Sequence, residues 1–180
     1  MANIYYSTPY SLEKNLGRAY NEEMARLPKD SDWMCFVDSD TCFLMPDYGH
    51  QIHNIVERHP EAGMLTCLTN RVGCIAQLHE GKMSEISDIK YHKRIAAAVQ
   101  KKYWCKVKKI NIPISGVMMI MQKKLWKKIP FSEKLGILGV DNLISKKILA
   151  KGYPIYLMRG VYIFHYYRMI EGIKYKKHLK

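Results

Sequence analysis

Residues 33–47, WMCFVDSDTCFLMPD, place two carboxylates between apolar segments. The segment 33–37 is apolar without alternation, which is typical of a strand that is buried on both faces of a sheet. Asp38 and Asp40 follow at its carboxyl end, where side chains two residues apart point to the same side. Two like charges held that close repel each other unless a positive group lies between them. The stretch therefore predicts a central strand with a site for a positive group at its end.

Strands and helices are predicted to alternate along the rest of the chain. Apolar segments rich in β-forming residues predict strands at 3–8, 62–69, 112–122 and, as two short strands, 153–167. Helical spacing of apolar residues predicts helices at 12–27 (with Ser11 as N-cap), 46–59, 89–100, 123–129 and 141–150. The alternation predicts an α/β three-layer sandwich around a mostly parallel sheet, in which ligands bind beyond the carboxyl ends of the strands. Residues 1–168 are predicted to form one domain, followed by a basic tail at 169–180.

The composition indicates an anionic partner. Lys and Arg number 29 against 16 Asp and Glu, which gives a net charge of +13. A basic balance of this size favours phosphates, an acidic glycan, the surface of an anionic membrane or nucleic acid. A basic surface without a specific ligand is the alternative.

The cysteines and the hydropathy pattern indicate the compartment. Five cysteines show no CxxC spacing, and Cys35, Cys42 and Cys67 lie in apolar segments, where a free thiol packs as a small apolar group. Neither a structural zinc nor a disulfide framework is expected. The sequence has no signal-peptide pattern and no apolar run of the roughly 20 residues that a membrane span requires. These features predict a cytoplasmic protein, with peripheral contact at the inner membrane surface as a further expectation.

The acidic pair favours a divalent cation. Carboxylate oxygens suit Mg²⁺ or Mn²⁺, which commonly take one or two protein carboxylates and leave other positions to substrate phosphates. Two alternatives stay open on these residues. The pair could cap backbone N–H groups, or Asp38 could be the nucleophile of a haloacid-dehalogenase-type phosphatase, although Cys42 stands where that motif has Thr or Val.

Four blocks of the chain, in this order and spacing, together resemble GT-A glycosyltransferases of the family-2-like type. The blocks are NLGRAYNEEMARL (15–27), FVDSDTCFLMPD (36–47), ISGVMMIMQKKLWKKI (114–129) and GVDNLISKKILAKGYPIYLM (139–158). The resemblance extends over residues 3–167 and implies a Rossmann-like GT-A fold. It also implies transfer of a hexose from a UDP- or GDP-sugar to an acceptor hydroxyl, by an inverting single displacement that uses Mn²⁺ or Mg²⁺.

The resemblance also implies roles for individual residues. Asp40 would bind the metal directly, Asp38 would bind it through water or contact the ribose, and His165 would complete the coordination. Asp141 would be the base that deprotonates the acceptor. The nucleotide would lie against Thr8, Pro9, Tyr10, Asn15, Arg18, Asp38 and Ser39, and the transferred sugar or the acceptor against Ser115, Gly116 and Asp141.

Two departures from the family pattern bear on substrate recognition. The chain passes from NIYYSTPY directly into the 15–27 block, without the acidic strand that helps read the nucleotide base in such enzymes. Val140 stands where the family usually has Glu before Asp141. A basic protein that binds nucleic acid or lipid without catalysis is the remaining alternative.

Overall fold

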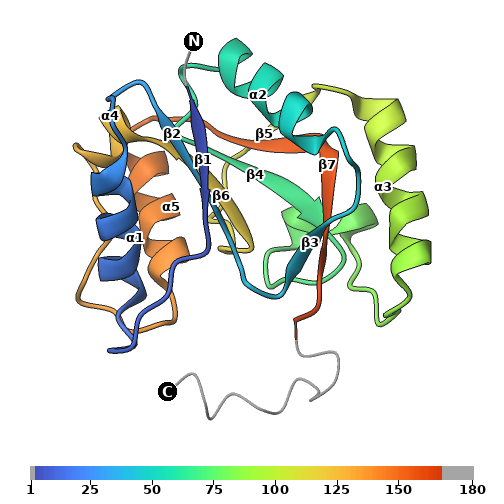
Figure 1. Ribbon diagram of the computed structural model, residues 1–180, viewed down its shortest axis with the longest axis horizontal. Helices are drawn as coiled ribbons and strands as arrows, with labels where there is room; N and C mark the ends of the chain where they lie inside the picture. The colour runs from blue at the N-terminus through green and yellow to red at the C-terminus, as the bar shows by residue number, and fades with distance from the viewer. Residues whose placement is uncertain (1–2, 168–180) are drawn as a thin grey trace.

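Seven strands of the computed structural model form one open sheet, and residues 3–167 are the part of the chain that it describes (Figure 1). The sheet order is β1-β2-β6-β4-β7-β3, and β5 also pairs with β7. The strands are β1 (Ile4–Ser7), β2 (Trp33–Val37), β3 (Thr41–Phe43), β4 (Met64–Thr69), β5 (Val107–Ile110), β6 (Met118–Gln122) and β7 (Ile155–His165). The tail predicted at 169–180 lies outside the described residues.

The sheet is mixed, so the prediction of a mostly parallel sheet holds only for part of it. β1 pairs with β2 and β4 pairs with β7 in parallel, whereas β6 is antiparallel to both β2 and β4. β1, β2, β4 and β7 therefore run in one direction and end at the same edge of the sheet. β3 and β5 are antiparallel to β7.

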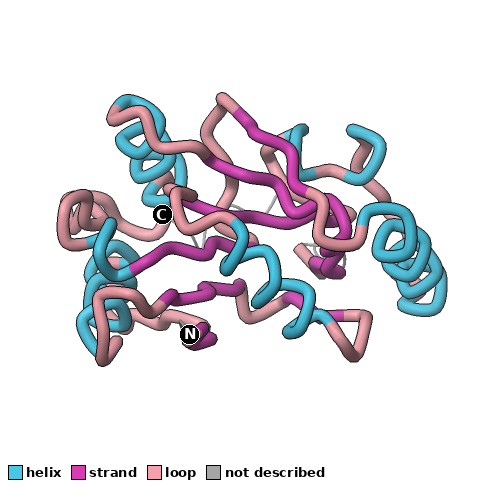
Figure 2. The backbone as a smooth tube through the Cα atoms, turned by 90° about the horizontal axis from the view of Figure 1, so that it is seen from above, coloured by secondary structure: helices cyan, strands magenta, loops and turns pink. Residues whose placement is uncertain are grey.

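Helices cover both faces of the sheet (Figure 2). α1 (Leu16–Arg26), α4 (Lys123–Trp126) and α5 (Val140–Ala150) pack on one face, against a cluster that includes Met34, Phe36 and Met119. α2 (Tyr48–Arg58) packs on the other face, over Cys35, Leu65 and Ile120, and α3 (Ile89–Tyr103) covers β7. β2 has all but its last residue buried, as its continuous apolar pattern predicted.

The 15–27 block attaches α1 to the segment that precedes α5. Asn15 caps the helix by accepting from the Arg18 N–H, and its Nδ2 donates to the Glu133 carbonyl at 2.9 Å. Asn21 accepts from Trp126 Nε1 at 2.8 Å and from the Phe131 N–H at 3.0 Å. These contacts explain why two asparagines bracket the first turns of this helix.

Gly17 lies where α1 and the following segment come closest, so its substitution is predicted to destabilise the fold. A Cβ at this position would lie 2.0 Å from the Ser132 carbonyl oxygen, a backbone atom that cannot rotate away. We expect Gly17→Ala to lower the free energy of unfolding by at least ~2 kcal/mol. Urea denaturation followed by circular dichroism measures the change.

Gly49, near the start of α2, provides the matched control. A Cβ there meets nothing within 4 Å, so Gly49→Ala should raise stability by up to ~1 kcal/mol through its helix propensity. Equal effects of the two substitutions would show that the close approach at Gly17 does not hold.

Several local expectations are wrong, among them the strand at 112–122, of which only Met118–Gln122 forms β6. Ser11 does not cap α1, because residues 11–14 form a turn closed by a bond from the Lys14 N–H to the Ser11 carbonyl, and Asn15 takes the cap. Residues 155–165 form one strand rather than two, since a register shift opposite Cys67/Leu68 absorbs the irregularity around Gly160. Cys42 is exposed on β3, whereas Cys35 and Cys67 are buried as predicted.

None of the helices in residues 3–167 has the length and apolar character needed to cross a bilayer.

Candidate functional site

Asp38 and Asp40 lie in a tight turn between β2 and β3. The Asp38 carbonyl accepts from the Thr41 N–H at 3.2 Å and from Thr41 Oγ1 at 2.7 Å, which closes the turn. The Asp38 N–H donates to the Val117 carbonyl at 3.2 Å, next to β6. The backbone of the acidic pair is thus satisfied within the sheet, and both carboxylates are left to face the end of β7.

His165 ends β7 opposite this turn, and its ring is held in one orientation. Its Nδ1 lies 2.7 Å from the Arg71 carbonyl, an acceptor, so Nδ1 carries the proton in that bond. Asn70 binds the His165 backbone on both sides, since Asn70 Oδ1 accepts from the His165 N–H at 2.7 Å and Nδ2 donates to its carbonyl at 3.0 Å. Nε2 is then the ring nitrogen that faces the two carboxylates. Histidines that bind metals commonly have this kind of support from a backbone carbonyl.

The distances among the three side chains suit a small divalent cation. His165 Nε2 lies 3.2 Å from Asp40 Oδ1 and 3.7 Å from Asp38 Oδ2, and one ligand atom from each side chain lies within 4.8 Å of the others. Two adjacent ligands of an octahedral ion, each at about 2.1 Å from it, are separated by about 3 Å. Asp38, Asp40 and His165 are therefore the residues that could hold a metal ion here.

The two carboxyl groups differ in acidity. Burial raises the pKa of Asp38 to about 6, and the charges of Asp40 and Asp141 add to this effect, whereas His165 opposes it. Burial also disfavours the charge on Asp40, but the hydrogen bond and the charge of His165 outweigh it and hold that pKa below its usual range. Asp40 is thus the more firmly ionised of the two carboxyl groups. Asp38 is the one whose negative charge is disfavoured, mainly by burial and further by the neighbouring carboxylates.

Asp141 lies in the first turn of α5 and lines one cavity together with Asp38 and His165. Its Oδ2 accepts from the Gly116 N–H at 2.8 Å, and its Oδ1 accepts from the Asn142 N–H at 2.8 Å. α5 begins at Val140 after Gly139, whose φ of 84° is left-handed, so Asp141 lies inside the first turn of the helix. The bond to Gly116 fixes the carboxylate at the amino end of β6, and a Cβ on Gly116 would lie 3.3 Å from the Asp141 Cβ.

A cavity of about 350 Å³ joins these groups at the edge where β2 and β7 end and β6 begins. Asp38, His165, Ser115, Gly116 and Asp141 all line it. Among its described lining residues there is no Lys or Arg, although the chain has a net charge of +13. Any phosphate group in this cavity would need a bound cation to offset its charge, because the wall itself is acidic.

Four polar residues that support the site had no assignment from the sequence. Asn70 and Arg71 follow β4 and position His165, while the buried Gln77 clamps Ser115 by accepting from its N–H at 2.8 Å and donating to its carbonyl at 3.1 Å. Tyr20 of α1 lines the cavity, and burial together with the charges of Asp38 and Asp141 raises the pKa of its phenol. The signal for Asn70 and Arg71 was their place directly after a buried strand.

Apart from Asp38, the residues predicted to meet the nucleotide lie near this edge but do not line the cavity. Thr8, Pro9 and Tyr10 follow β1, and the Tyr10 side chain is 79% exposed. Arg18 forms ion pairs with Glu13 at 2.9 Å and Glu22 at 3.0 Å, on the surface of α1. The Asn15 side chain is used in the helix cap, and Ser39 is exposed in the turn between the two carboxylates. Their nucleotide-binding roles stay predictions.

Binding of Mn²⁺ is predicted to weaken below pH 6. With a pKa of about 6, Asp38 is largely protonated in the metal-free protein at pH 5, so a cation must displace that proton. We expect the Mn²⁺ affinity to fall by up to ~10-fold per pH unit below pH 6 and to level off above pH 7, as measured by isothermal titration. Asp38→Asn should flatten this dependence, and an affinity that is constant from pH 5 to 7 in the parent protein would contradict the assignment.

No protein-family model matches the chain, and a comparison with curated proteins gives no match. Function is therefore inferred from the site itself.

Proposed function

We propose that this protein is a metal-dependent glycosyltransferase of the GT-A type, which moves a sugar from a nucleotide-diphospho sugar to an acceptor hydroxyl. The α/β fold with its site at the strand ends is compatible with a Rossmann-like architecture. The observation that carries the proposal is a cavity that combines Asp38 and His165 of the candidate ligand set with a separate carboxylate, Asp141.

The two parts of the cavity match the two requirements of glycosyl transfer. The leaving group is a nucleoside diphosphate, whose growing negative charge calls for a cation, and the described lining residues of the cavity include no Lys or Arg. Asp38, Asp40 and His165 would hold Mn²⁺ or Mg²⁺ for this purpose, and that ion would act as a Lewis acid on the diphosphate. Mn²⁺ is favoured over Mg²⁺ by the imidazole in the set.

Asp141 would accept the proton of the attacking hydroxyl. Its carboxylate is fixed by the N–H groups of Gly116 and Asn142, so it is oriented before substrate binds. Ser115 and Gly116 would border the sugar. Gln77 holds this segment in place by accepting from the Ser115 N–H. A base on the acceptor side and a metal on the leaving-group side fit an inverting single displacement.

A thermal-shift panel tests the proposal. UDP, GDP, CDP and TDP are each added with and without Mn²⁺, and a ligand that binds only the folded state raises the melting temperature by mass action. We expect at least one nucleoside diphosphate to stabilise the protein in a Mn²⁺-dependent manner. Absence of a metal-dependent shift with every nucleotide would overturn the proposal.

The phosphatase alternative is separated by a different readout. In such an enzyme Asp38 would form a covalent phosphoenzyme, which mass spectrometry detects after incubation with a phosphate ester and which Asp38→Asn would abolish. In the transferase, no phosphoenzyme forms, and Asp38→Asn instead weakens metal-dependent nucleotide binding.

A further inference from the structure

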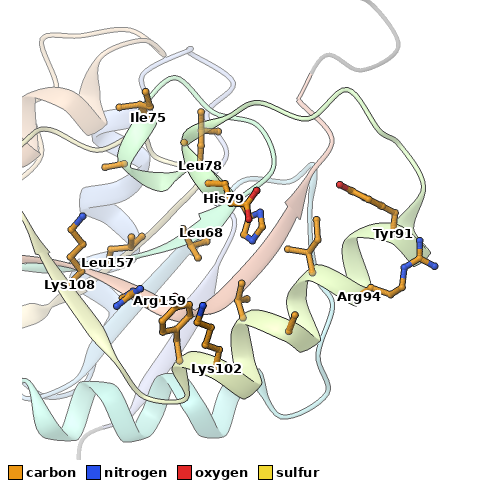
Figure 3. A pocket seen from close by; sticks show the side chains of 17 residues that line it. Leu68, Ile75, Leu78, His79, Tyr91, Arg94, Lys102, Lys108, Leu157 and Arg159 are labelled. Carbon is orange, nitrogen blue, oxygen red and sulfur yellow. The ribbon is translucent and has the colours of Figure 1, made fainter.

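A second and larger cavity lies between α3 and the segment 75–81, which contains η1 (Ile75–Gln77) and η2 (His79–Gly81) (Figure 3). Its volume of about 820 Å³ falls in the range of pockets that hold small molecules or lipid chains. It shares no lining residue with the cavity at Asp38 and Asp141, so it is a separate site.

The floor and walls of this groove are largely apolar. Leu68 of β4 and Leu157 of β7 form the floor, and Ile95 and Val99 of α3 line one wall. Ile75 lines the opposite wall and is 65% exposed, so its side chain adds apolar surface that is open to a ligand. The groove therefore suits an apolar chain.

Cations gather at one end of the groove. Figure 3 shows Lys102, Lys108 and Arg159 together at this end, while Tyr91 and Arg94 lie at the other. The Arg159 guanidinium lies 3.8 Å and the Lys102 ammonium 5.2 Å from the centre of the Tyr103 ring.

These three cations have no carboxylate partner among the described residues. Within residues 3–167, neither Lys102 nor Lys108 nor Arg159 forms an ion pair with a carboxylate. The hydrogen bond from Lys102 and the nearby positive charges lower the pKa of Tyr103, which is consistent with a strongly positive local potential. A group of cations without a carboxylate partner among the described residues is complementary to an anionic ligand.

The surrounding segment extends this positive field. Residues 90–109, which include most of α3 and three of the four residues of β5, carry eight Lys and Arg and no Asp or Glu. Nucleic acid would satisfy the charge, but it would gain little from an apolar groove whose floor is aliphatic. A membrane lipid offers both an anionic head and an apolar chain, and basic residues near an anionic bilayer each contribute about 1 kcal/mol.

We propose that this groove binds an anionic membrane lipid, with the acyl chain along Leu68 and Leu157 and the headgroup phosphate on Lys102, Lys108 and Arg159. The two features that carry this assignment are the apolar groove and the unpaired cations at its end. The chain would then associate peripherally with an anionic membrane surface through α3 and β5, whatever the activity at Asp38 and Asp141.

Vesicle co-sedimentation of the full chain tests this assignment. The protein should sediment with vesicles of phosphatidylcholine and phosphatidylglycerol but not with phosphatidylcholine alone. The triple variant Lys102→Gln/Lys108→Gln/Arg159→Gln should lower partitioning at least ~10-fold, from the loss of three headgroup contacts. Because Arg159 stacks on Tyr103, the double variant Lys102→Gln/Lys108→Gln replaces it if the triple variant does not fold.

A charge-matched control separates the groove from the overall charge. Lys146→Gln/Lys147→Gln/Lys151→Gln removes three exposed cations in and next to α5, outside the groove, and should lower partitioning by less than ~3-fold. Ala98→Trp fills the groove without a change of charge, at an exposed position of α3, and should also lower partitioning.

Three outcomes would overturn the proposal. They are equal losses in the two triple variants, unchanged partitioning of Ala98→Trp, and sedimentation that does not depend on phosphatidylglycerol. Single-stranded RNA that binds more tightly than vesicles, and equally well to Ala98→Trp, would assign the cations to nucleic acid instead.

Discussion

Asp40→Asn is expected to reduce donor turnover by ~1,000-fold or more, measured as Mn²⁺-dependent release of nucleoside diphosphate with water as acceptor. The substitution keeps the volume of the side chain but removes the charge that lies 3.2 Å from His165 Nε2. Asp40 is also the carboxyl group whose pKa is held below its usual range, so it is the ligand most suited to a cation. The Mn²⁺ affinity should fall more than ~100-fold, beyond the loss that a supporting residue typically causes.

Asp30→Asn is the matched control for this variant. Asp30 forms an exposed ion pair with Lys127 at 2.5 Å, beyond the opposite end of β2 from Asp38, and such pairs contribute little to stability. It should leave turnover and Mn²⁺ affinity within about twofold of the parent. Asp40→Asn that retains full Mn²⁺ dependence while Asp30→Asn behaves as expected would remove Asp40 from the ligand set.

Asp141→Asn is expected to lower turnover by ~100- to 10,000-fold, while the Mn²⁺-dependent binding of nucleotide stays unchanged. The asparagine oxygen can still accept from the Gly116 N–H, so the fold around the cavity is kept, but the amide cannot take the proton of the acceptor. Steady-state turnover and the thermal shift with nucleotide separate the two effects.

Asp141→Glu distinguishes a base from a structural role. It retains the charge but moves it by one methylene group, into the space beside Gly116, where a Cβ would already lie 3.3 Å from the Asp141 Cβ. We expect partial activity that remains above that of Asp141→Asn. If Asp141→Asn retained full turnover, the base would have to be another group.

The strand that ends in the acidic pair could be predicted because its signal is local. WMCFV is apolar at every position, and β2 lies at the interior of the sheet, where both faces are covered. Short edge strands could not be predicted in the same way. β5 has two exposed lysines in four residues, a pattern that protects a sheet edge and hides the strand in a basic stretch.

The three candidate metal ligands were predicted more completely than the residues that hold His165 in place. Asp38 and Asp40 are separated by one residue in the chain and His165 followed from the family resemblance, and the structure brings the three together. Asn70 and Arg71 had only the weaker signal of following a buried strand, because their role depends on hydrogen bonds to a residue 95 and 94 positions further along the chain. Such pairings follow from the sheet register, which the sequence pattern of one strand does not determine.

The sequence pattern of the 15–27 block is compatible both with nucleotide binding and with helix packing. Asn15 was expected beside the nucleotide, whereas the structure uses it, together with Asn21 and Gly17, to hold α1 against residues 131–136. A packing role is sufficient to explain Asn15 and Asn21. Arg18, which faces solvent from the same helix, keeps its predicted phosphate contact only if it leaves Glu13 and Glu22.

The most direct measurement is an anomalous difference map, recorded at the manganese absorption edge from a crystal grown with Mn²⁺ and the nucleoside diphosphate that stabilises the protein. We expect one peak bonded at about 2.0–2.3 Å to an Asp40 carboxylate oxygen and to His165 Nε2, with diphosphate oxygens on its open side. A bound nucleotide without a peak at these residues, or a peak at other side chains, would contradict the metal-dependent mechanism.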